Sequence, residues 1–258
     1  MPGVMDRPPW AGRSPRDVAE KGAGVMADRS RAKPRHPLGR LVRSLGKRVR
    51  RLREGGNERR FLDAARGIVH VGANSGQEAA GYARLGVPVV WIEPLPDVFA
   101  ALETRIASYP RQRAVQALVS DTDGAEVDFH LAGESSSMFA FADHKKLWPD
   151  IDAKGVLRLT TSRLDTLMDR LGLEASDYDS LVVDTQGAEL LVLRGAGARL
   201  AGFRRIVAEA ADFEAYRGAT NVEELTAFLA AAGFRLRHKA SMAGRKDVGT
   251  YYNLYFER

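Results

Sequence analysis

The amino-acid sequence predicts an α/β fold built around a mostly parallel, doubly wound sheet. Beyond the N-terminal region, short apolar runs alternate with segments of helical periodicity, as expected for a chain of strand–helix–strand units. The apolar run at 68–72 enters a turn containing Gly72 and Gly76, and a second apolar run at 88–93 ends in Glu93. A strand, a glycine turn and, about twenty residues later, a strand-end acid are typical of a crevice that binds an adenosine-containing ligand.

By composition the chain divides into three parts. Residues 1–36 are rich in Pro, Gly, Arg and Asp without sustained periodicity, and we expect them to be disordered. Residues 37–60 contain a basic amphipathic helix, over 38–54, in which apolar residues recur at helical spacing among arginines and lysines, followed by a short linker. Residues 61–258 are long enough to bury a single core and form the predicted folded domain.

The basic charge of the chain is concentrated near its N-terminus. Residues 1–60 contain 17 lysines and arginines against 6 acidic residues, whereas residues 61–258 contain 22 against 27. The net charge of +6 therefore does not indicate that the folded domain binds DNA. The helix at 38–54 could lie on an anionic membrane surface, dock on a protein partner, or pack its apolar stripe on the domain.

Cysteine is absent, which excludes disulfides, thiolate catalysis and cysteine-ligated zinc, and fits a reducing compartment. No apolar run approaches the roughly 18 residues that a membrane-spanning helix needs. We therefore expect a cytoplasmic protein, with peripheral attachment to the inner membrane surface through residues 38–54 as an alternative.

Each element of the expected sheet has its own signal in the sequence. Short apolar runs predict strands at 68–72, 88–93, 114–119, 126–131, 157–161, 180–184, 205–209, 234–239 and 251–257. Helical periodicity predicts helices near 76–85, 97–107, 163–171, 188–194 and 222–232. The last helix stops at Gly233 and two strand-like runs follow, which predicts a C-terminal antiparallel hairpin of the kind that completes class I methyltransferase sheets. The long irregular stretch 139–155 has the character of a lid.

The turn after the first strand favours S-adenosylmethionine (SAM) over a dinucleotide. The turn lacks the G-x-G-x-x-G spacing that places a pyrophosphate at a helix N-terminus. SAM has no phosphate and needs only close approach of the backbone, which Gly72 and Gly76 allow, and polar groups such as Asn74 for its amino-acid end. Glu93 is then predicted to hold the ribose hydroxyls, because an acid that ends an apolar strand is costly unless it is paired. The alternative is a helix cap or a salt bridge.

Two groups of short polar residues could complete the cofactor site. Ser120 and Asp121 follow the predicted strand at 114–119, a position that lies beside the adenine in this fold, although Asp121 suits the turn before the next strand equally well. The serine cluster at 135–137, which includes Ser137, could present hydroxyls to a cofactor or a sugar, or act as a flexible hinge.

Two strand-end acids form a second constellation. Asp184 and Glu209 each follow an apolar run, and the carboxyl ends of parallel strands meet at one edge of a sheet, so the two side chains could face one crevice. There they could bind substrate hydroxyls, share a divalent metal ion or act as a general base, and one of them could only brace its loop.

His144 is the candidate general base among the histidines, because it lies in the lid stretch and histidine titrates near neutrality. His70 lies inside the first strand, beside the cofactor turn, and is expected to be a hydrogen-bonded core residue. The sequence contains no H-E-x-x-H spacing, no G-x-S-x-G elbow and no P-loop. No dedicated metal site is predicted, while a divalent ion on Asp184 and Glu209 stays open.

In their order along the chain, these motifs resemble those of the FkbM-type SAM-dependent methyltransferases. The matching segments are 68–78, 92–96, 119–121 with Gly124, 135–137, 163–165, 184–189, 233–234 and 253–256. The resemblance covers roughly residues 61–258. It implies a Rossmann-like class I SAM-dependent methyltransferase fold and methylation of hydroxyl groups, often those of sugars or polyketides.

The resemblance also implies roles for individual residues. The methionine end of SAM would be lined by Gly72, Asn74 and Gly76, and His70 and Ala73 are further candidate cofactor-binding residues. The ribose would lie at Glu93, the adenine at Asp121 and the transferred methyl near Asp184 and Gln186. Where the family often has an acid before the turn, this chain has His70.

The leading hypothesis is an O-methyltransferase acting on a sugar, an oligosaccharide or a related small molecule. The alternatives are an RNA methyltransferase that uses the basic tail for phosphate contacts, and a non-catalytic docking protein that binds a partner through residues 38–54. A NAD-dependent enzyme ranks below these because the middle glycine is missing. The lid and the terminal hairpin could mediate a homodimer.

Overall fold

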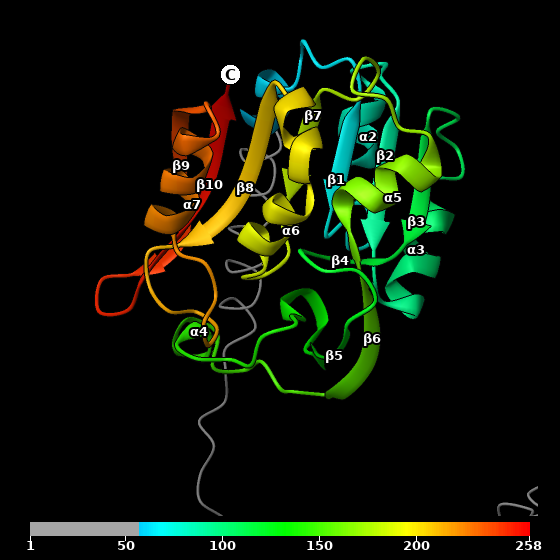
Figure 1. Ribbon diagram of the computed structural model, residues 1–258. Coiled ribbons are helices and arrows are strands. Elements are labelled where there is room, and N and C mark those ends of the chain that lie inside the picture. The colour runs from blue at the N-terminus through cyan, green and yellow to red at the C-terminus, as the bar shows by residue number, and fades with distance from the viewer. Residues whose placement is uncertain (1–56) are drawn as a thin grey trace, which may run out of the picture. The chain divides into compact units, whose positions relative to one another are not determined.

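The computed structural model describes residues 57–258 (Figure 1). The predicted disordered tail, 1–36, and the predicted amphipathic helix, 38–54, lie outside these residues. The described part of the chain begins with a helical turn at 57–61 that leads into the first strand.

A seven-stranded sheet in the order β3-β2-β1-β7-β8-β10-β9 forms the centre of the fold. Its strands are β1 (Ile68–Val71), β2 (Val89–Glu93), β3 (Gln112–Gln116), β7 (Ser180–Val183), β8 (Arg205–Ala211), β9 (Arg235–Arg245) and β10 (Gly249–Glu257). Strands β3, β2, β1, β7 and β8 run parallel, and β10 pairs antiparallel with both β8 and β9. This arrangement confirms the predicted Rossmann-like fold, including the antiparallel C-terminal hairpin.

Helices cover both faces of the sheet, which is why its central strands are buried throughout and mostly apolar. The helices are α2 (Ala79–Ala83), α3 (Pro96–Ile106), α5 (Leu164–Leu171), α6 (Glu189–Gly195) and α7 (Val222–Ala231). One face packs against α5, α6 and α7, which lie in front of the sheet in Figure 1, and the other against α2 and α3. Successive residues of β1 alternate between these two cores, so that Ile68 and Val69 are both fully buried.

The sheet reverses its direction of winding at β1, which lies between β2 and β7. The chain goes from β1 to β2 on one side and returns to β7 on the other. In open α/β sheets, ligands bind at such a switch point, outside the carboxyl ends of the strands. The turns after β1, β2 and β7 therefore surround the expected site.

The predicted strand at 114–119 is wrong as a single element. The structure divides it at Ala117 into β3 and β4 (Leu118–Ser120), and β4 belongs to a second sheet of order β4-β6-β5. Its other strands are β5 (Glu126–Leu131) and β6 (Gly155–Arg163). Apolar residues continue through the break because β4 is also buried, although it pairs with a strand of the second sheet. The hydrophobic pattern of the sequence does not show which strand a residue pairs with, so it cannot reveal this change.

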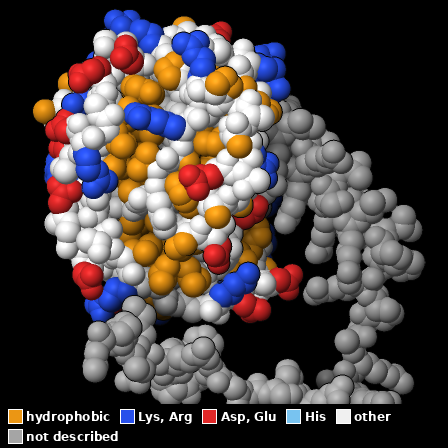
Figure 2. All heavy atoms as spheres, turned by 90° about the vertical axis from the view of Figure 1, so that its right-hand side faces the viewer, with side chains coloured by type: hydrophobic (Ala, Val, Ile, Leu, Met, Phe, Trp, Pro, Cys, Tyr) orange, Lys and Arg blue, Asp and Glu red, His pale blue; other side chains and the backbone are white. Residues whose placement is uncertain are grey.

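Strand β3 forms one edge of the main sheet. Its residues are only partly buried, and Gln112, Arg113 and Gln116 place polar groups along it. Figure 2, viewed from this side of the molecule, shows apolar patches interrupted by basic and acidic side chains. Charged and polar residues on an edge strand oppose pairing with another chain.

The second sheet and the lid stretch lie beyond the carboxyl ends of the main strands, at the bottom of Figure 1. The segment that connects β5 to β6 contains a 3-10 turn, η1 (Gly133–Ser135), and a short helix, α4 (His144–Leu147). A second 3-10 segment, η2 (Gly197–Gly202), leads into β8. The predicted lid at 139–155 is thus partly ordered by a helical turn.

Candidate active site

Two cavities open at the carboxyl edge of the sheet. The first, of about 260 Å³, lies between the ends of β1 and β2 and the second sheet. The second, of about 670 Å³, lies on the other side of the ends of β1 and β7 and reaches β10 and α4. The residues that line both cavities are Gly72, Asn74, Glu134, Asp184 and Gln186. We call these five residues the junction.

The turn after β1 brings the backbone close to β7. Gly72 has a φ of +82°, and a β-carbon at this position would overlap the carbonyl oxygen of Asp184. The Gly72 N–H donates to the carbonyl of Ile92 (3.0 Å). Glycine is therefore required here both by the left-handed conformation and by the close approach of a second backbone.

Glu93 ends β2 and lies inside the first cavity. One carboxylate oxygen accepts from the N–H of Asn74 (2.9 Å) and the other from the N–H of Leu95 (3.0 Å). Burial raises the pKa of Glu93 to about 7, against these two hydrogen bonds, which lower it. The carboxylate is thus fixed by backbone donors, in the geometry expected of a group that accepts from the ribose hydroxyls.

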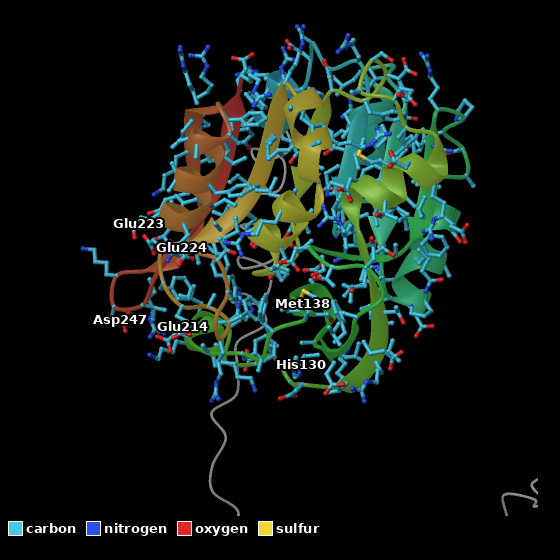
Figure 3. The ribbon with its side chains drawn as sticks, viewed as in Figure 1. His130, Met138, Glu214, Glu223, Glu224 and Asp247 are labelled. Carbon is cyan, nitrogen blue, oxygen red and sulfur yellow. The ribbon has the colours of Figure 1, made fainter. Side chains whose placement is uncertain are left out.

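Apolar residues that sequence reasoning missed form much of the remaining wall of the first cavity. They are Leu95, Val98, Phe129 and Met138, and Figure 3 shows Met138 below the ends of the central strands. An apolar slot with a strand-end acid at one side and polar junction residues at the other fits the adenosine and the amino-acid end of SAM. No pattern in the sequence distinguishes these four residues from ordinary core residues.

Four of the predicted cofactor residues, Gly76, Ser120, Asp121 and Ser137, line neither cavity. A β-carbon at Gly76 would lie 2.6 Å from the Leu102 side chain, so this glycine serves the packing of the turn against α3. Ser120 is buried and its hydroxyl donates to the Asp121 carboxylate (3.4 Å). The roles of Gly76, Ser120 and Asp121 as cofactor ligands stay predictions.

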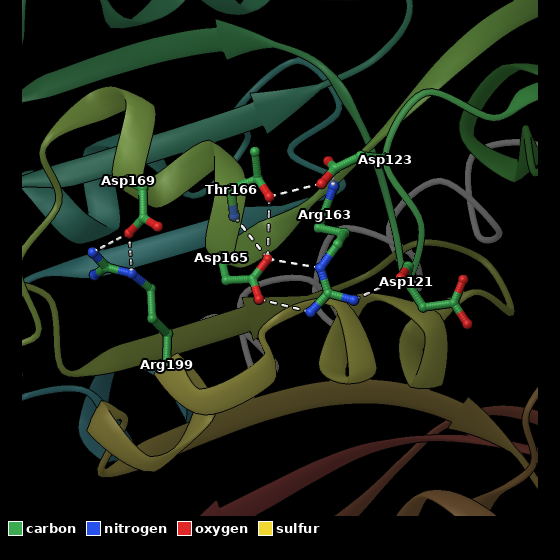
Figure 4. Close-up of polar contacts among 7 residues, drawn as sticks. All are labelled: Asp121, Asp123, Arg163, Asp165, Thr166, Asp169 and Arg199. Atoms are coloured by element: carbon green, nitrogen blue, oxygen red, sulfur yellow. Dashed lines mark hydrogen bonds and ion pairs between the residues drawn. The ribbon is translucent and has the colours of Figure 1, made fainter.

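Asp121 belongs to a polar network around Arg163 (Figure 4). The Arg163 guanidinium donates to the Asp121 carbonyl (2.8 Å) and to both carboxylate oxygens of Asp165 (2.9 and 2.6 Å). Asp123 accepts from the Arg163 N–H (2.6 Å) and from the Thr166 hydroxyl (2.7 Å). The loop after β4 is thereby tied to the start of α5.

Ser137 lies outside the cavity lining but supports it. The side chain is 1% exposed; its hydroxyl donates to the backbone carbonyl of Gln186 (2.8 Å) and accepts from the Phe139 N–H (3.0 Å). Ser137 thus holds the turn after β7, whereas Ser136 lines the first cavity and Ser135 lines the second.

Asp184 and Glu209 are linked through one amide. The Gln186 amide nitrogen donates to Asp184 Oδ1 (2.8 Å) and to Glu209 Oε1 (3.3 Å). Both residues line the second cavity, as expected. The predicted strand end at Glu209 is wrong, because β8 continues to Ala211 through its pairing with β10 and Glu209 lies within the strand. Burial, with a smaller contribution from Glu134, raises the pKa of Asp184 above its usual range.

Glu189 braces the turn that carries Asp184 and Gln186. Its carboxylate is 1% exposed and accepts from the N–H groups of Thr185 (2.9 Å) and Gly187 (3.0 Å). Burial raises the pKa of Glu189 to about 7. Sequence reasoning noted only that Glu189 begins a helix; its contact with the preceding turn depends on the left-handed Gln186 and on Gly187.

His144 is buried in the wall of the second cavity. Its Nδ1 lies 2.6 Å from the Tyr251 hydroxyl and its Nε2 lies 3.0 Å from Ser135 Oγ. The ring stacks on Phe141 and packs against Trp148. Burial lowers the pKa of His144 to about 4, so the imidazole is neutral at physiological pH.

His70 and Ala73 line the second cavity rather than the first. His70 Nδ1 lies 3.2 Å from the Tyr82 hydroxyl, which donates a short hydrogen bond to Glu58. Burial lowers the pKa of His70 to about 3 and raises that of Glu58 to about 8. The expected hydrogen-bonded core role of His70 agrees with this geometry.

Residues 57–258 contain neither a cluster of metal-ligating side chains nor a membrane-spanning helix. No group of three or more His, Asp or Glu side chains in this part of the chain could hold a metal ion. No helix in the same range is long and apolar enough to cross a membrane.

Comparison with known proteins identifies the family. The family model described as the methyltransferase FkbM domain matches residues 70–236, more than half of the chain. The chain belongs to the FkbM methyltransferase family. The resemblance noted in the motifs is confirmed.

One curated relative of this FkbM methyltransferase is the 2-O-methyltransferase NoeI of Sinorhizobium fredii (strain NBRC 101917 / NGR234). It is 28% identical over 162 residues, which are 58% of this chain and 65% of the relative. The chain therefore spans less than two thirds of the length of this relative.

Two solved structures are similar to this chain at low sequence identity. Magnesium protoporphyrin IX methyltransferase ChlM of Synechocystis PCC 6803, with bound SAH, has a TM-score of 0.47 and 11% identity over 82% of this chain and 84% of that chain. Aeropyrum pernix fibrillarin, with bound SAM, has a TM-score of 0.43 and 14% identity over 73% and 65%. The fold class is established by the strand order of the sheet.

Proposed function

We propose that this FkbM methyltransferase transfers the methyl group of SAM to a hydroxyl of a sugar, an oligosaccharide or a related small molecule. The observation that carries the proposal is the meeting of two cavities at a junction that contains Asp184 and Gln186. The printed name of the relative NoeI, a 2-O-methyltransferase, supports oxygen as the methylated atom.

The first cavity is the proposed cofactor site. Glu93 accepts from the ribose hydroxyls, the apolar wall around Val98 and Met138 holds the adenosine, and Asn74 lies toward the amino-acid end. When bound, SAM supplies a methyl group on a positively charged sulfur, which is a good leaving group. The protein mainly has to align the acceptor oxygen and exclude water.

The second cavity is the proposed acceptor site. It is larger than the first, and its wall combines the aromatic rings of Trp148 and Tyr251 with the polar side chains of Asn253, Asp184 and Glu209. Aromatic faces and carboxylates together suit a hydroxylated ring, because the ring carbons pack on the aromatic surface while the hydroxyls donate to the carboxylates.

Asp184 and Glu209 are the proposed general bases. As the acceptor oxygen bonds to the methyl carbon and the carbon–sulfur bond breaks, the hydroxyl proton goes to one of these carboxylates. A raised carboxylate pKa favours this transfer, because a base acts best when its pKa lies near the working pH. His144 is the other candidate base; its two engaged nitrogens and its pKa of about 4 make it a weaker proton acceptor.

Calorimetric titration of the full chain with SAM, SAH and NAD tests the cofactor site. We expect SAM and SAH to bind, and Glu93→Ala to weaken both by about ten-fold or more, because it removes the carboxylate that the ribose hydroxyls would donate to. Glu103→Ala, on the exposed side of α3, is the matched control and should bind like the wild type. Binding of NAD alone would contradict the proposal.

Incubation with labelled SAM and a panel of mono- and oligosaccharides tests the acceptor. The expected product is a methyl ether, identified by mass spectrometry and by the position of the label. Transfer to RNA or to amines in preference to every hydroxyl acceptor would overturn the O-methyltransferase assignment.

A further inference from the structure

Gln186 is held at three points at the junction of the two cavities. Its backbone takes the left-handed conformation (φ +55°), which is uncommon outside glycine. The Ser137 hydroxyl donates to its carbonyl (2.8 Å), and the Tyr216 hydroxyl donates to its side-chain Oε1 (2.8 Å). The Gln186 amide nitrogen then faces Asp184 and Glu209.

The Tyr216 hydroxyl and the two carboxylates together fix the orientation of the amide; the same hydroxyl also lies 3.3 Å from the Ser135 carbonyl oxygen. With Oε1 accepting from Tyr216, the NH₂ group must point the other way, where it donates at 2.8 Å to Asp184 and at 3.3 Å to Glu209. A flipped amide would place an oxygen against two carboxylate oxygens and leave the Tyr216 hydroxyl facing an NH₂ group. Tyr216 is 1% exposed, so water cannot readily replace this contact.

We propose that Gln186, oriented by Tyr216, is a positioning residue that holds Asp184 and Glu209 as a carboxylate pair, with Asp184 at the cofactor cavity and Glu209 at the acceptor cavity. This pair lets the site distinguish the positively charged SAM from its neutral product SAH. The inference rests on the proposed function, since it takes the first cavity as the cofactor site. Asp184 lines both cavities, which places its carboxylate on the route between cofactor and acceptor.

The surroundings of the pair explain why an oriented donor is needed. Asp184 interacts electrostatically with Glu134, Glu93, Glu189 and Glu58, each of which comes from a different element. Glu209 interacts in the same way with Tyr216 and Tyr251, and the neutral His144 lies in the same wall. Because so many acids lie together in a partly desolvated site, the protonated forms of the Asp184 and Glu209 carboxyl groups are favoured. A hydrogen bond from an N–H donor opposes this protonation, because it stabilises the ionised carboxylate.

An ionised carboxylate at this position favours binding of the positively charged SAM. This preference disappears once the methyl group has been transferred. Opposite charges attract more strongly in a cavity than in water. Methyl transfer removes the positive charge from sulfur, and the hydroxyl proton removes the negative charge from the carboxylate. The junction is then left without the charge pair that favoured the methyl donor, which assists the release of SAH.

Separate titrations of SAM and SAH, without any acceptor, test this inference at one fixed pH. The variants are Tyr216→Phe, which removes the donor to Oε1, and Gln186→Met, which keeps the length of the side chain but removes both hydrogen-bonding groups. Tyr252→Phe is the matched control, because the Tyr252 hydroxyl donates to Asp212 (3.1 Å) and lines neither cavity. The readout is the ratio of the two dissociation constants.

We expect both variants to reduce the preference for SAM over SAH by about ten-fold relative to wild type, with the affinity for SAH nearly unchanged. The Tyr252→Phe ratio should equal that of wild type. A merely structural role would weaken SAM and SAH by the same factor, and that result, like an unchanged ratio, overturns the inference. Failure of the wild type to bind either compound refutes the proposed function instead.

Discussion

Gly72 illustrates how a single residue determines the geometry of the junction. Its left-handed φ and the Asp184 carbonyl beside its α-carbon leave no room for a side chain. We expect Gly72→Ala to lower the free energy of unfolding by about 2–3 kcal/mol or more, because strained backbone and overpacking act together. Urea denaturation measures this change. Titration of the folded fraction of the variant with SAH should show that binding is lost.

Gly81 provides the matched control for that substitution. It lies within α2, and a β-carbon there would meet nothing within 4 Å. Gly81→Ala should leave stability unchanged or raise it by about 0.5–1 kcal/mol, because alanine has the higher helix propensity. Equal losses of unfolding free energy in Gly72→Ala and Gly81→Ala would contradict this explanation, because the close backbone approach at Gly72 would then make no difference to stability.

Residue by residue, sequence reasoning found the parts of the site that have a strand-end signature. Gly72, Asn74, Glu93, Asp184 and Gln186 all line the first cavity, since a turn or an acid after an apolar run shows in the sequence. Glu134 and Met138 also line it, but ordinary residues in an irregular segment carry no such signature. Their position depends on how the segment after β5 folds back over the sheet.

At the scale of elements, α7 shows how local chemistry and the core cooperate. The Asn221 side chain accepts from the Glu224 N–H (2.9 Å), and the Glu224 carboxylate accepts from the Asn221 N–H (3.3 Å). This capping box begins a helix whose Leu225 and Leu229 are fully buried, and Figure 3 labels Glu224 at its start.

Asn221→Ala should therefore destabilise the protein by about 1 kcal/mol, because it removes the acceptor for an N–H at the start of the helix. Asn221→Asp keeps an acceptor oxygen and should remain close to wild type. Chemical denaturation of the two variants beside wild type makes the comparison. A loss of the same size in Asn221→Asp would show that the cap contributes little.

The elements that the sequence predicted well are those whose neighbours along the chain are also neighbours in the sheet. Strands β1 and β2 are predicted within a residue, and each is buried throughout and mostly apolar because helices cover both of its faces. Strand β9 runs six residues past its expected end, through a mixture of small, apolar and polar residues that are ordered by pairing with β10. Pairing between strands supplies order that local composition does not reveal.

At the scale of the whole molecule, buried ionisable groups make stability depend on pH. The pKa of Glu93 and of Glu189 is raised from 4.5 to about 7, and that of Glu58 to about 8. Their contributions are fully present below pH 4.5 and are lost as the pH rises through the folded values. His70 and His144, with lowered pKa values, contribute stability that is fully present above pH 6.5. This stability is lost as the pH falls toward 4 for His144 and toward 3 for His70.

Between pH 6.5 and 8, only the acids of these two sets lose their contribution. We expect the free energy of unfolding to fall across this interval by about 3 kcal/mol, from the linkage of these pKa shifts to folding. Glu189→Gln cannot ionise and should show a fall that is shallower by about 1 kcal/mol. Urea denaturation at several pH values measures both slopes, and parallel curves would contradict the burial assigned to Glu189.

The aromatic wall of the second cavity has a practical consequence. Trp148 lines that cavity, whereas Trp91 is fully buried and stacks between His70 and Tyr82. A molecule entering the cavity changes the polarity around Trp148 and leaves Trp91 in its buried environment; Trp10, the third tryptophan of the sequence, lies outside the described residues. The protein therefore has its own optical reporter, and acceptor candidates could be screened by intrinsic fluorescence, with Trp148→Phe as the silent reference.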